Sequence, residues 1–305
     1  MRSGLRWAVL LAGLLLSVGP AKADEPTRLA LVIGVSDYDR NGRVDTSEAG
    51  VAIAQAAGYA PDLANATNDA RLVAEALRGI GYSVQLVLDP DRAAMRAAID
   101  AFGVRTQAAP ANRHAVLYFA GHGVLLTGYS VLFPAGANIA AAANTPAVER
   151  SAALNAIAVK LQDIVVPLRR PRDDGLLLIV VDACRNNPWR ESFDNDSTRA
   201  GLVKLSDQLV VVMNDHGFPE AVVAYSTNPL NAAEDGGDVN SAYAKALAQR
   251  LGTPEMTVFN MLDGVRRDVA AATNAHQIPT MNVSKLSRQR CLVSCPPGPT
   301  PTPAP

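Results

Sequence analysis

The sequence is poor in cysteine, in aromatic residues and in net charge. Only 3 of its 305 residues are cysteine, which is too few for a fold built on disulfide bonds. Aromatic residues make up 5% of the chain, and the formal net charge is −1. A near-neutral chain lacks the broad basic surface with which nucleic-acid-binding proteins neutralise phosphates, so we expect no nucleic-acid partner.

The residues that are abundant favour a globular α/β protein. A hydrophobic fraction of 49% is enough to bury a sizeable core and excludes disorder as the main state. Apolar runs of strand length predict strands at residues 28–35, 82–88, 115–120, 175–181 and 221–225. Helical spacing predicts helices near residues 68–77, 91–108, 158–168, 241–251 and 257–273. Their alternation predicts a helix-sheet-helix sandwich with a mostly parallel central sheet.

The two ends of the chain differ from the middle in composition. Residues 1–23 place two arginines before an apolar run and end in the sequence AKA, which is the organisation of a secretory signal peptide. We therefore expect an exported protein, periplasmic or secreted, without a membrane span after cleavage; an uncleaved anchor is the alternative. Residues 287–305 form a Cys-containing, proline-rich tail, which leaves residues 24–286 as one domain.

Two of the three cysteines stand close together at the start of this tail. Cys291 and Cys295 are four positions apart, and a zinc site would need two further soft ligands. In an exported protein a small disulfide loop is the simpler interpretation, and two unpaired thiols are the alternative.

Two predicted strands end in residues that suit nucleophilic catalysis. The strand at 115–120 runs into the sequence AGHG, which contains His122, and the strand at 175–181 runs into DACRN, which contains Cys184. Because the carboxyl ends of parallel strands meet at one edge of a sheet, this imidazole and this thiol can face each other. An adjacent base activates a thiol. Singly, a buried cysteine and a hydrogen-bonded turn histidine are the alternatives, but their joint placement favours a catalytic dyad.

These motifs resemble those of the caspase-like cysteine peptidases, the superfamily of caspases, metacaspases and bacterial caspase-like proteins. The resemblance extends over about residues 28–281 and includes ALVIG, TNDAR and YST, which begin at positions 30, 67 and 225. It implies a caspase-like fold and a cysteine-type endopeptidase in which His122 is the general base or the ion-pair partner of Cys184, the nucleophile. The backbone amides of Gly123 and Cys184 would form the oxyanion hole.

The resemblance also indicates which substrates the pocket would accept. Caspases that cut after aspartate line their pocket with arginine and glutamine, whereas here Asp182 stands two positions before Cys184 and Asp69 lies in the TNDAR motif. Two carboxylates favour a guanidinium or an ammonium group, so we expect peptide or protein substrates with Arg or Lys before the scissile bond. Asp69 has an alternative role as a first-turn helix acid. Ala120 departs from metacaspases, which usually have serine there.

A second motif follows the first predicted strand. Residues 37–48, DYDRNGRVDTSE, fit the twelve-residue calcium loop of an EF-hand, with a helix expected at residues 49–57. The ligands would be Asp37, Asp39, Asn41, the carbonyl of Arg43, Asp45 and Glu48. A strand precedes the loop where an EF-hand has a helix, so a solvated acidic insertion is the alternative. We expect no organic cofactor.

The sequence therefore predicts an exported cysteine endopeptidase that cuts after basic residues and is modulated by Ca²⁺. The main alternative is a catalytically inactive caspase-like binding or adaptor domain with a calcium-binding loop. A third and weaker interpretation is a hydrolase or transferase of the same Cys-His type that acts on non-peptide acyl groups.

Overall fold

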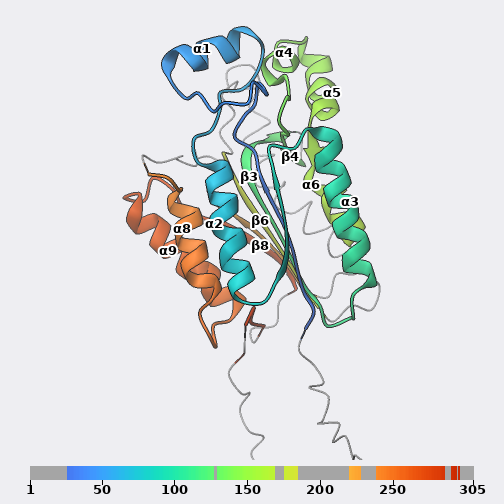
Figure 1. The fold of residues 1–305 in the computed structure, drawn as a ribbon, viewed down its shortest axis with the longest axis vertical. Helices are drawn as coiled ribbons and strands as arrows, with labels where there is room; N and C mark the ends of the chain where they lie inside the picture. The colour runs from blue at the N-terminus through green and yellow to red at the C-terminus, as the bar shows by residue number, and fades with distance from the viewer. Residues whose placement is uncertain are drawn as a thin grey trace, which may run out of the picture.

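A central sheet with helices on both faces forms the body of the protein (Figure 1). The computed structural model describes residues 26–126, 129–168, 175–184, 220–227, 238–285, 290–293 and 295. The main strands are β1 Arg28–Gly34, β2 Ser83–Leu88, β3 His114–Leu126, β6 Leu176–Cys184, β7 Ala221–Tyr225 and β8 Thr280–Lys285. Their order is β2-β1-β3-β6-β7-β8, and all neighbours are parallel except β7 and β8. The predicted helix-sheet-helix sandwich with a mostly parallel sheet is confirmed.

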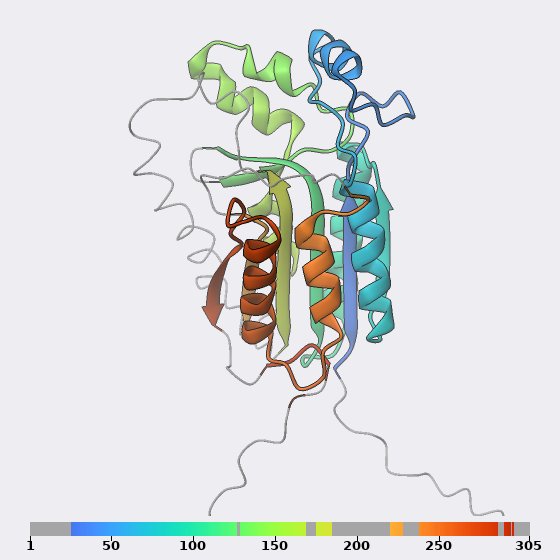
Figure 2. The same cartoon turned by 90° about the vertical axis from the view of Figure 1, so that its left-hand side faces the viewer.

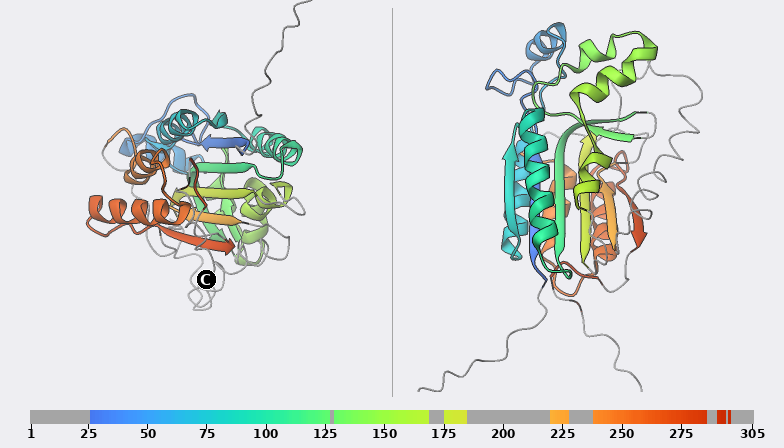
Figure 3. Two further views of the ribbon diagram at one scale, coloured as in Figure 1. Left: turned by 90° about the horizontal axis from the view of Figure 1, so that it is seen from below. Right: turned by 90° about the vertical axis from the view of Figure 1, so that its right-hand side faces the viewer.

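Helices lie on both faces of this sheet (Figures 2 and 3), and a separate apolar core fills the space on each face. Helices α2 Ala66–Gly79, α8 Ala242–Leu251 and α9 Val258–Ala272 cover one face. Helices α3 Arg92–Ala108 and α6 Leu161–Val165, with the 3-10 turn η1 Val166–Leu168, cover the other face, while α5 Ala147–Ile157 lies above α3 at the upper end of the molecule in Figure 1. Alternate residues of β1 enter the two cores, as in a strand buried on both sides.

Smaller elements lie beyond the carboxyl ends of the parallel strands. Helices α1 Glu48–Ala56 and α4 Ile139–Ala143 are found there, at the upper end of the molecule in Figure 1. β3 continues past the main sheet and pairs antiparallel with β4 Tyr129–Leu132, which pairs in turn with β5 Val159–Lys160.

Several helix starts follow the capping residues that the sequence offers. The side chain of Asp91 accepts a hydrogen bond from the backbone N–H of Ala94 at 2.9 Å and caps α3. Ser241 and Thr257 cap α8 and α9 in the same way. Helix α2 differs, because it begins two residues before the predicted Asn68, with Asn65 as its N-cap.

The sequence patterns missed or shortened other elements. β8, α4 and α5 were not expected, and the helix predicted from residue 158 begins only at Leu161, after β5. β3 and β6 are both longer than predicted, since their apolar runs end before the strands do. Hydrogen bonding to a neighbouring strand, which composition does not reveal, extends them.

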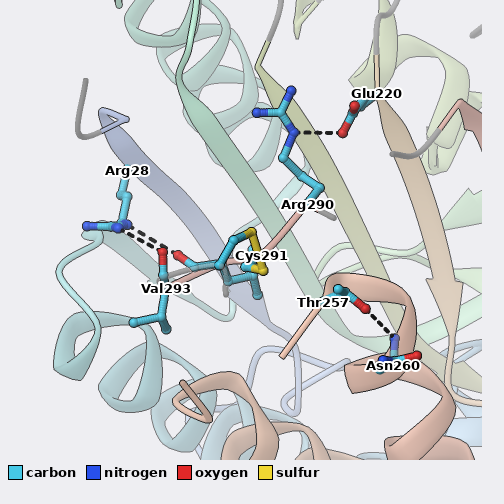
Figure 4. The surroundings of a disulfide bond; sticks show 9 residues. Arg28, Glu220, Thr257, Asn260, Arg290, Cys291 and Val293 are labelled. Atoms are coloured by element: carbon cyan, nitrogen blue, oxygen red, sulfur yellow. Dashed lines mark hydrogen bonds and ion pairs between the residues drawn. A yellow bond between two sulfur atoms is a disulfide. The ribbon is translucent and has the colours of Figure 1, made fainter. Parts of the chain in front are cut away.

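The start of β1 and the segment around Cys291 lie together at the end of the sheet opposite α1 and α4, where Arg28 donates to the carbonyls of Leu292 and Val293. Cys291 and Cys295 form a disulfide, which confirms the predicted pairing (Figure 4). The predicted signal peptide, residues 1–23, lies outside the described residues, as does most of the predicted tail. Within the part of the chain that the structure describes, none of the helices is long and apolar enough to cross a membrane.

Candidate active site

His122 and Cys184 lie on adjacent parallel strands at matching positions. In the register of β3 and β6, His122 pairs with Cys184, one residue beyond the pair of Gly121 and Ala183. The backbones of two residues 62 positions apart in sequence are therefore neighbours. Both residues stand inside strands, which corrects the prediction that they occupy turns after the strands end.

A glycine is required just before the histidine. Gly121 has a φ of +155°, a conformation that residues with a side chain rarely adopt. A Cβ atom at this position would lie 2.8 Å from the hydroxyl oxygen of Tyr38. The glycine in AGHG thus allows the backbone of β3 to contact the Tyr38 hydroxyl group closely. His122 follows at the carboxyl end of the parallel pairing with β6.

A backbone carbonyl orients the His122 ring. Nε2 of His122 lies 2.8 Å from the carbonyl oxygen of Pro61. A carbonyl can only accept, so in this geometry Nε2 carries the proton and Nδ1 of the neutral ring is left as the proton acceptor. Burial lowers the pKa of His122, while the hydrogen bond to Pro61 and the charge of Asp62 oppose this shift. The neutral imidazole that a general base requires is thereby favoured at neutral pH.

The two predicted pocket acids are brought together from distant parts of the chain. Asp69 lies in the first turn of α2 and Asp182 near the end of β6, and both side chains are buried. Ser241 links them, since its backbone N–H donates to Oδ1 of Asp69 at 3.0 Å and its hydroxyl donates to Oδ2 of Asp182 at 3.4 Å. Asn240 also donates to Asp69, at 2.9 Å. The start of α8, which was predicted only as a helix, thus completes this cluster.

Proximity of two carboxylates changes the acidity of one of them. Burial, together with the nearby charge of Asp69, raises the pKa of Asp182 to about 7. Tyr118 donates to Oδ2 of Asp182 at 2.9 Å, and burial beside this acid raises the pKa of the phenol well above its ordinary value. The Tyr118 hydroxyl consequently stays protonated and serves as a donor to the carboxylate.

Gly123, the predicted oxyanion residue, follows His122 directly in β3. It lies where β3 leaves β6 and pairs with Leu132 of β4. A Cβ atom here would lie 3.1 Å from the Cβ of Ala183 and 3.2 Å from the carbonyl oxygen of Val131. Glycine therefore allows three strands to converge beside the candidate dyad.

The acidic loop brings together only part of its predicted ligand set. Carboxylate oxygens of Asp37 and Asp39 lie within 4.8 Å of each other and of a third carboxylate, Asp62, in the single such group found among the described His, Cys, Asp and Glu residues. Asp45 and Glu48 are not members of that group.

The other predicted ligands make local contacts within the loop. The side-chain oxygen of Asn41 accepts from the backbone N–H of Arg43 at 2.8 Å, and Asp45 accepts from the N–H of Ser47 at 3.0 Å. Glu48 begins α1 and is exposed. Sequence reasoning missed Asp62, because it lies 14 positions beyond the loop. The Pro-Asp pair in which it stands is not a metal-binding motif.

The fold and the two strand ends agree with a comparison against known families. A model of the caspase domain, the family of C14 peptidases, matches residues 27–290. The chain belongs to this family. The caspase-domain assignment covers β1 through Arg290 and includes His122, Cys184 and both pocket acids.

Comparison with solved structures supports the same fold for this caspase-domain protein. A crystal structure of a Geobacter sulfurreducens protein is similar, with a TM-score of 0.55 and 13% sequence identity, over 89% of this chain and 100% of that one. A search of curated proteins finds no match to the chain. The structural likeness at this low identity concerns the fold alone.

Proposed function

We propose that this caspase-domain protein is an exported cysteine endopeptidase that uses Cys184 and His122 to hydrolyse peptide bonds after Arg or Lys. The observation that carries the proposal is the pairing of His122 with Cys184 across β3 and β6, beside the linked acids Asp69 and Asp182. Family membership supports a cysteine peptidase, and the individual residues of this chain support the mechanism and the specificity.

The chemistry would follow from the orientation of the imidazole. Nδ1 of His122 would take the thiol proton of Cys184, and the resulting thiolate would attack the substrate carbonyl carbon. Backbone amides of Gly123 and Cys184 would stabilise the oxyanion. Collapse of this intermediate would form a thioester and release the amine, which takes the proton from His122. Water activated by the same imidazole would then hydrolyse the thioester.

Specificity would arise from the pair of buried carboxylates. At neutral pH the raised pKa of Asp182 keeps a proton on this residue in part of the molecules, because the group is buried and Asp69 is charged nearby. A bound guanidinium or ammonium would replace that proton as the compensating positive charge. An acidic or apolar side chain would leave the repulsion between the two acids uncompensated, and we expect it to be rejected.

Calcium modulation is the second part of the proposal. Asp37 and Asp39 from the loop and Asp62 from the segment before α2 would supply oxygen ligands of the kind that Ca²⁺ prefers. Pro61, whose carbonyl holds His122, directly precedes Asp62. Ca²⁺ binding at Asp62 would therefore take place next to the backbone carbonyl that orients the ring of His122.

Peptide hydrolysis by the purified protein tests the catalytic proposal. Fluorogenic peptides ending in Arg, Lys or Asp before the leaving group should be cleaved in the first two cases only, and Cys184→Ala should abolish cleavage. Undiminished hydrolysis by Cys184→Ala rejects the dyad. No peptide hydrolysis by the wild type under any condition rejects the endopeptidase and favours the binding or adaptor domain. Ester substrates in the same screen distinguish a non-peptide acyl hydrolase.

Isothermal titration tests calcium separately from activity. The wild-type protein should release or absorb heat on titration with Ca²⁺, and Asp37→Ala should remove this signal. Glu48→Gln tells whether the EF-hand position 12 takes part, since the structure leaves Glu48 outside the carboxylate group. A flat wild-type titration would disprove the site.

A further inference from the structure

Tyr38 is a buried residue within an otherwise open acidic loop. It stands between Asp37 and Asp39, and its side chain is 0% exposed, whereas residues 40–49 are all exposed. A tyrosine that is completely buried needs partners for its hydroxyl group. These partners lie in β3 and in the residues just after β4.

The side chain of Tyr38 contacts His122 in two ways. The backbone N–H of His122 donates to the Tyr38 hydroxyl oxygen at 2.6 Å, and the two ring centroids are 4.5 Å apart with the planes tilted by 47°. The same hydroxyl donates to the carbonyl of Phe133 at 3.4 Å, and the N–H of Phe133 donates to the carbonyl of His122 at 3.0 Å. Tyr38 therefore fixes both the backbone and the ring face of His122.

The backbone of Tyr38 is held from the opposite side. Its N–H donates to Oδ1 of Asp62 at 2.8 Å, and its carbonyl accepts from the N–H of Gly136 at 3.1 Å. Oδ2 of Asp62 accepts from the N–H of Asp45 at 3.0 Å. Asp62 thus ties Tyr38 and the far part of the acidic loop to Pro61, its neighbour in sequence and the partner of the His122 ring.

We infer that Tyr38 is a positioning residue for His122 and that, with Asp62, it transmits the conformation of the acidic loop to the catalytic base. The inference rests on the proposed function of His122. Tyr38 supports the main chain and one face of the ring, while the carbonyl of Pro61 fixes the ring edge. Displacement of a catalytic group by about 1 Å can cost roughly 100-fold in rate, so a support of this kind acts on kcat.

The first test is Tyr38→Phe, which keeps the ring and removes the hydroxyl. The buried N–H of His122 then loses its acceptor, and we expect kcat for an Arg-ended peptide to fall about tenfold. KM should stay within about twofold, because Ser241 and Tyr118 hold the proposed specificity acids Asp69 and Asp182. Tyr82→Phe is the matched control: this tyrosine is also buried, at the start of β2, and its hydroxyl has no hydrogen-bond partner among the described residues.

A second measurement does not depend on any substrate. With Cys291 and Cys295 in a disulfide, Cys184 is the remaining thiol, and its alkylation by iodoacetamide can be followed by mass spectrometry. At pH 6.5 a positioned imidazole accelerates this reaction, so His122→Ala should slow it. Tyr38→Phe should slow it at least threefold, and Tyr82→Phe should leave it unchanged.

The outcomes separate the inference from the proposed function. No peptide cleavage by the wild type, with alkylation that depends on His122 and Tyr38, rejects the peptidase and keeps the positioning role. Wild-type kcat and alkylation in Tyr38→Phe overturn the inference, as does alkylation that ignores His122. If Tyr38→Phe does not fold, Asp62→Asn, measured with a calcium chelator, takes its place. It leaves one side-chain oxygen for the two N–H donors of Tyr38 and Asp45 and should lower both rates; unchanged rates overturn the inference.

Discussion

The two ends of the parallel sheet differ in how their charged groups are arranged. At the carboxyl end, two like-charged acids are buried together, Gly121 has an unusual backbone conformation and His122 is partly buried beside Tyr38. At the amino end, opposite charges are paired. Arg290 forms an ion pair with Glu220 at 2.7 Å, next to the disulfide of Cys291 (Figure 4).

The amino end also ties the last described residues to the first strand. The guanidinium of Arg28 donates to the carbonyl oxygens of Leu292 and Val293 at 3.3 and 3.4 Å, across more than 260 positions of sequence. The N–H of Val258 donates to the carbonyl of Arg290 at 2.8 Å. These contacts close the fold at the end of the sheet opposite His122 and the rest of the candidate site.

The largest expected effect is a loss of activity caused by removing the two acids at the carboxyl end of the sheet, without unfolding of the protein. Asp69→Asn combined with Asp182→Asn should lower kcat/KM for Arg-ended peptides about 100-fold, because a buried cation loses both charged partners. The free energy of unfolding should not fall, since the substitution removes a buried like-charge repulsion. Peptide kinetics and urea unfolding measure the two quantities; a large loss of stability would contradict the contrast between the ends.

An acid-induced loss of stability is expected from the amino end. Burial, with the positive charges of Arg290 and Arg28, lowers the pKa of His114 to about 4. The unfolded chain binds this proton near pH 6.5 and the folded protein only near pH 4. Stability from this group is therefore complete above pH 6.5 and decreases as the pH falls, by about 3 kcal/mol below pH 4.

Urea unfolding at several pH values measures this dependence. His114→Asn should flatten the pH dependence of stability between pH 6.5 and 4, and the comparison is with the wild-type protein. Asp182 acts in the opposite direction, because its raised pKa makes the folded protein hold a proton up to about pH 7 and so reduces stability as pH rises from about 4 to 7. A wild-type slope that survives in His114→Asn contradicts the assignment.

The smallest expected effect concerns the disulfide. Replacement of Cys291 and Cys295 by serine removes a short covalent loop, and the chain-entropy model predicts a loss of about 2 kcal/mol in the free energy of unfolding. Activity at 25 °C should be unchanged, because the disulfide and the dyad lie at opposite ends of the sheet. A fall in kcat without a fall in stability would show that the two ends are coupled.

Much of the architecture was predictable from sequence because it rests on local patterns. Apolar runs such as that of β1 and capping residues such as Asp91 act over a few neighbouring positions. The edge strand β8 was not predicted, because apolar and polar residues alternate only weakly in its sequence TMNVSK. Its place depends on antiparallel pairing with β7. The ends of β3 and β6 were misplaced for the same reason, since pairing with each other extends both strands.

The candidate site shows the same division. His122, Cys184, Asp69 and Asp182 were recognisable from their motifs, and the structure brings the two acids together through Ser241. Tyr38, Pro61 and Asp62 were missed. A carbonyl oxygen has no sequence signature, and a tyrosine in an acidic loop gives no sign that it turns inward to contact a histidine 84 positions away.

The sequence alone therefore determined the main parallel strands with most of the helices that flank them, the caspase-domain family and the candidate residues for cysteine peptidase chemistry. These depend on side-chain periodicity and on residue type, which are local properties. Only the tertiary structure decided which groups surround the imidazole, which acids share a site and which carboxylate joins Asp37 and Asp39. Those contacts join segments far apart in the chain, and their energies arise from burial and from charge proximity, which exist only after the chain has folded.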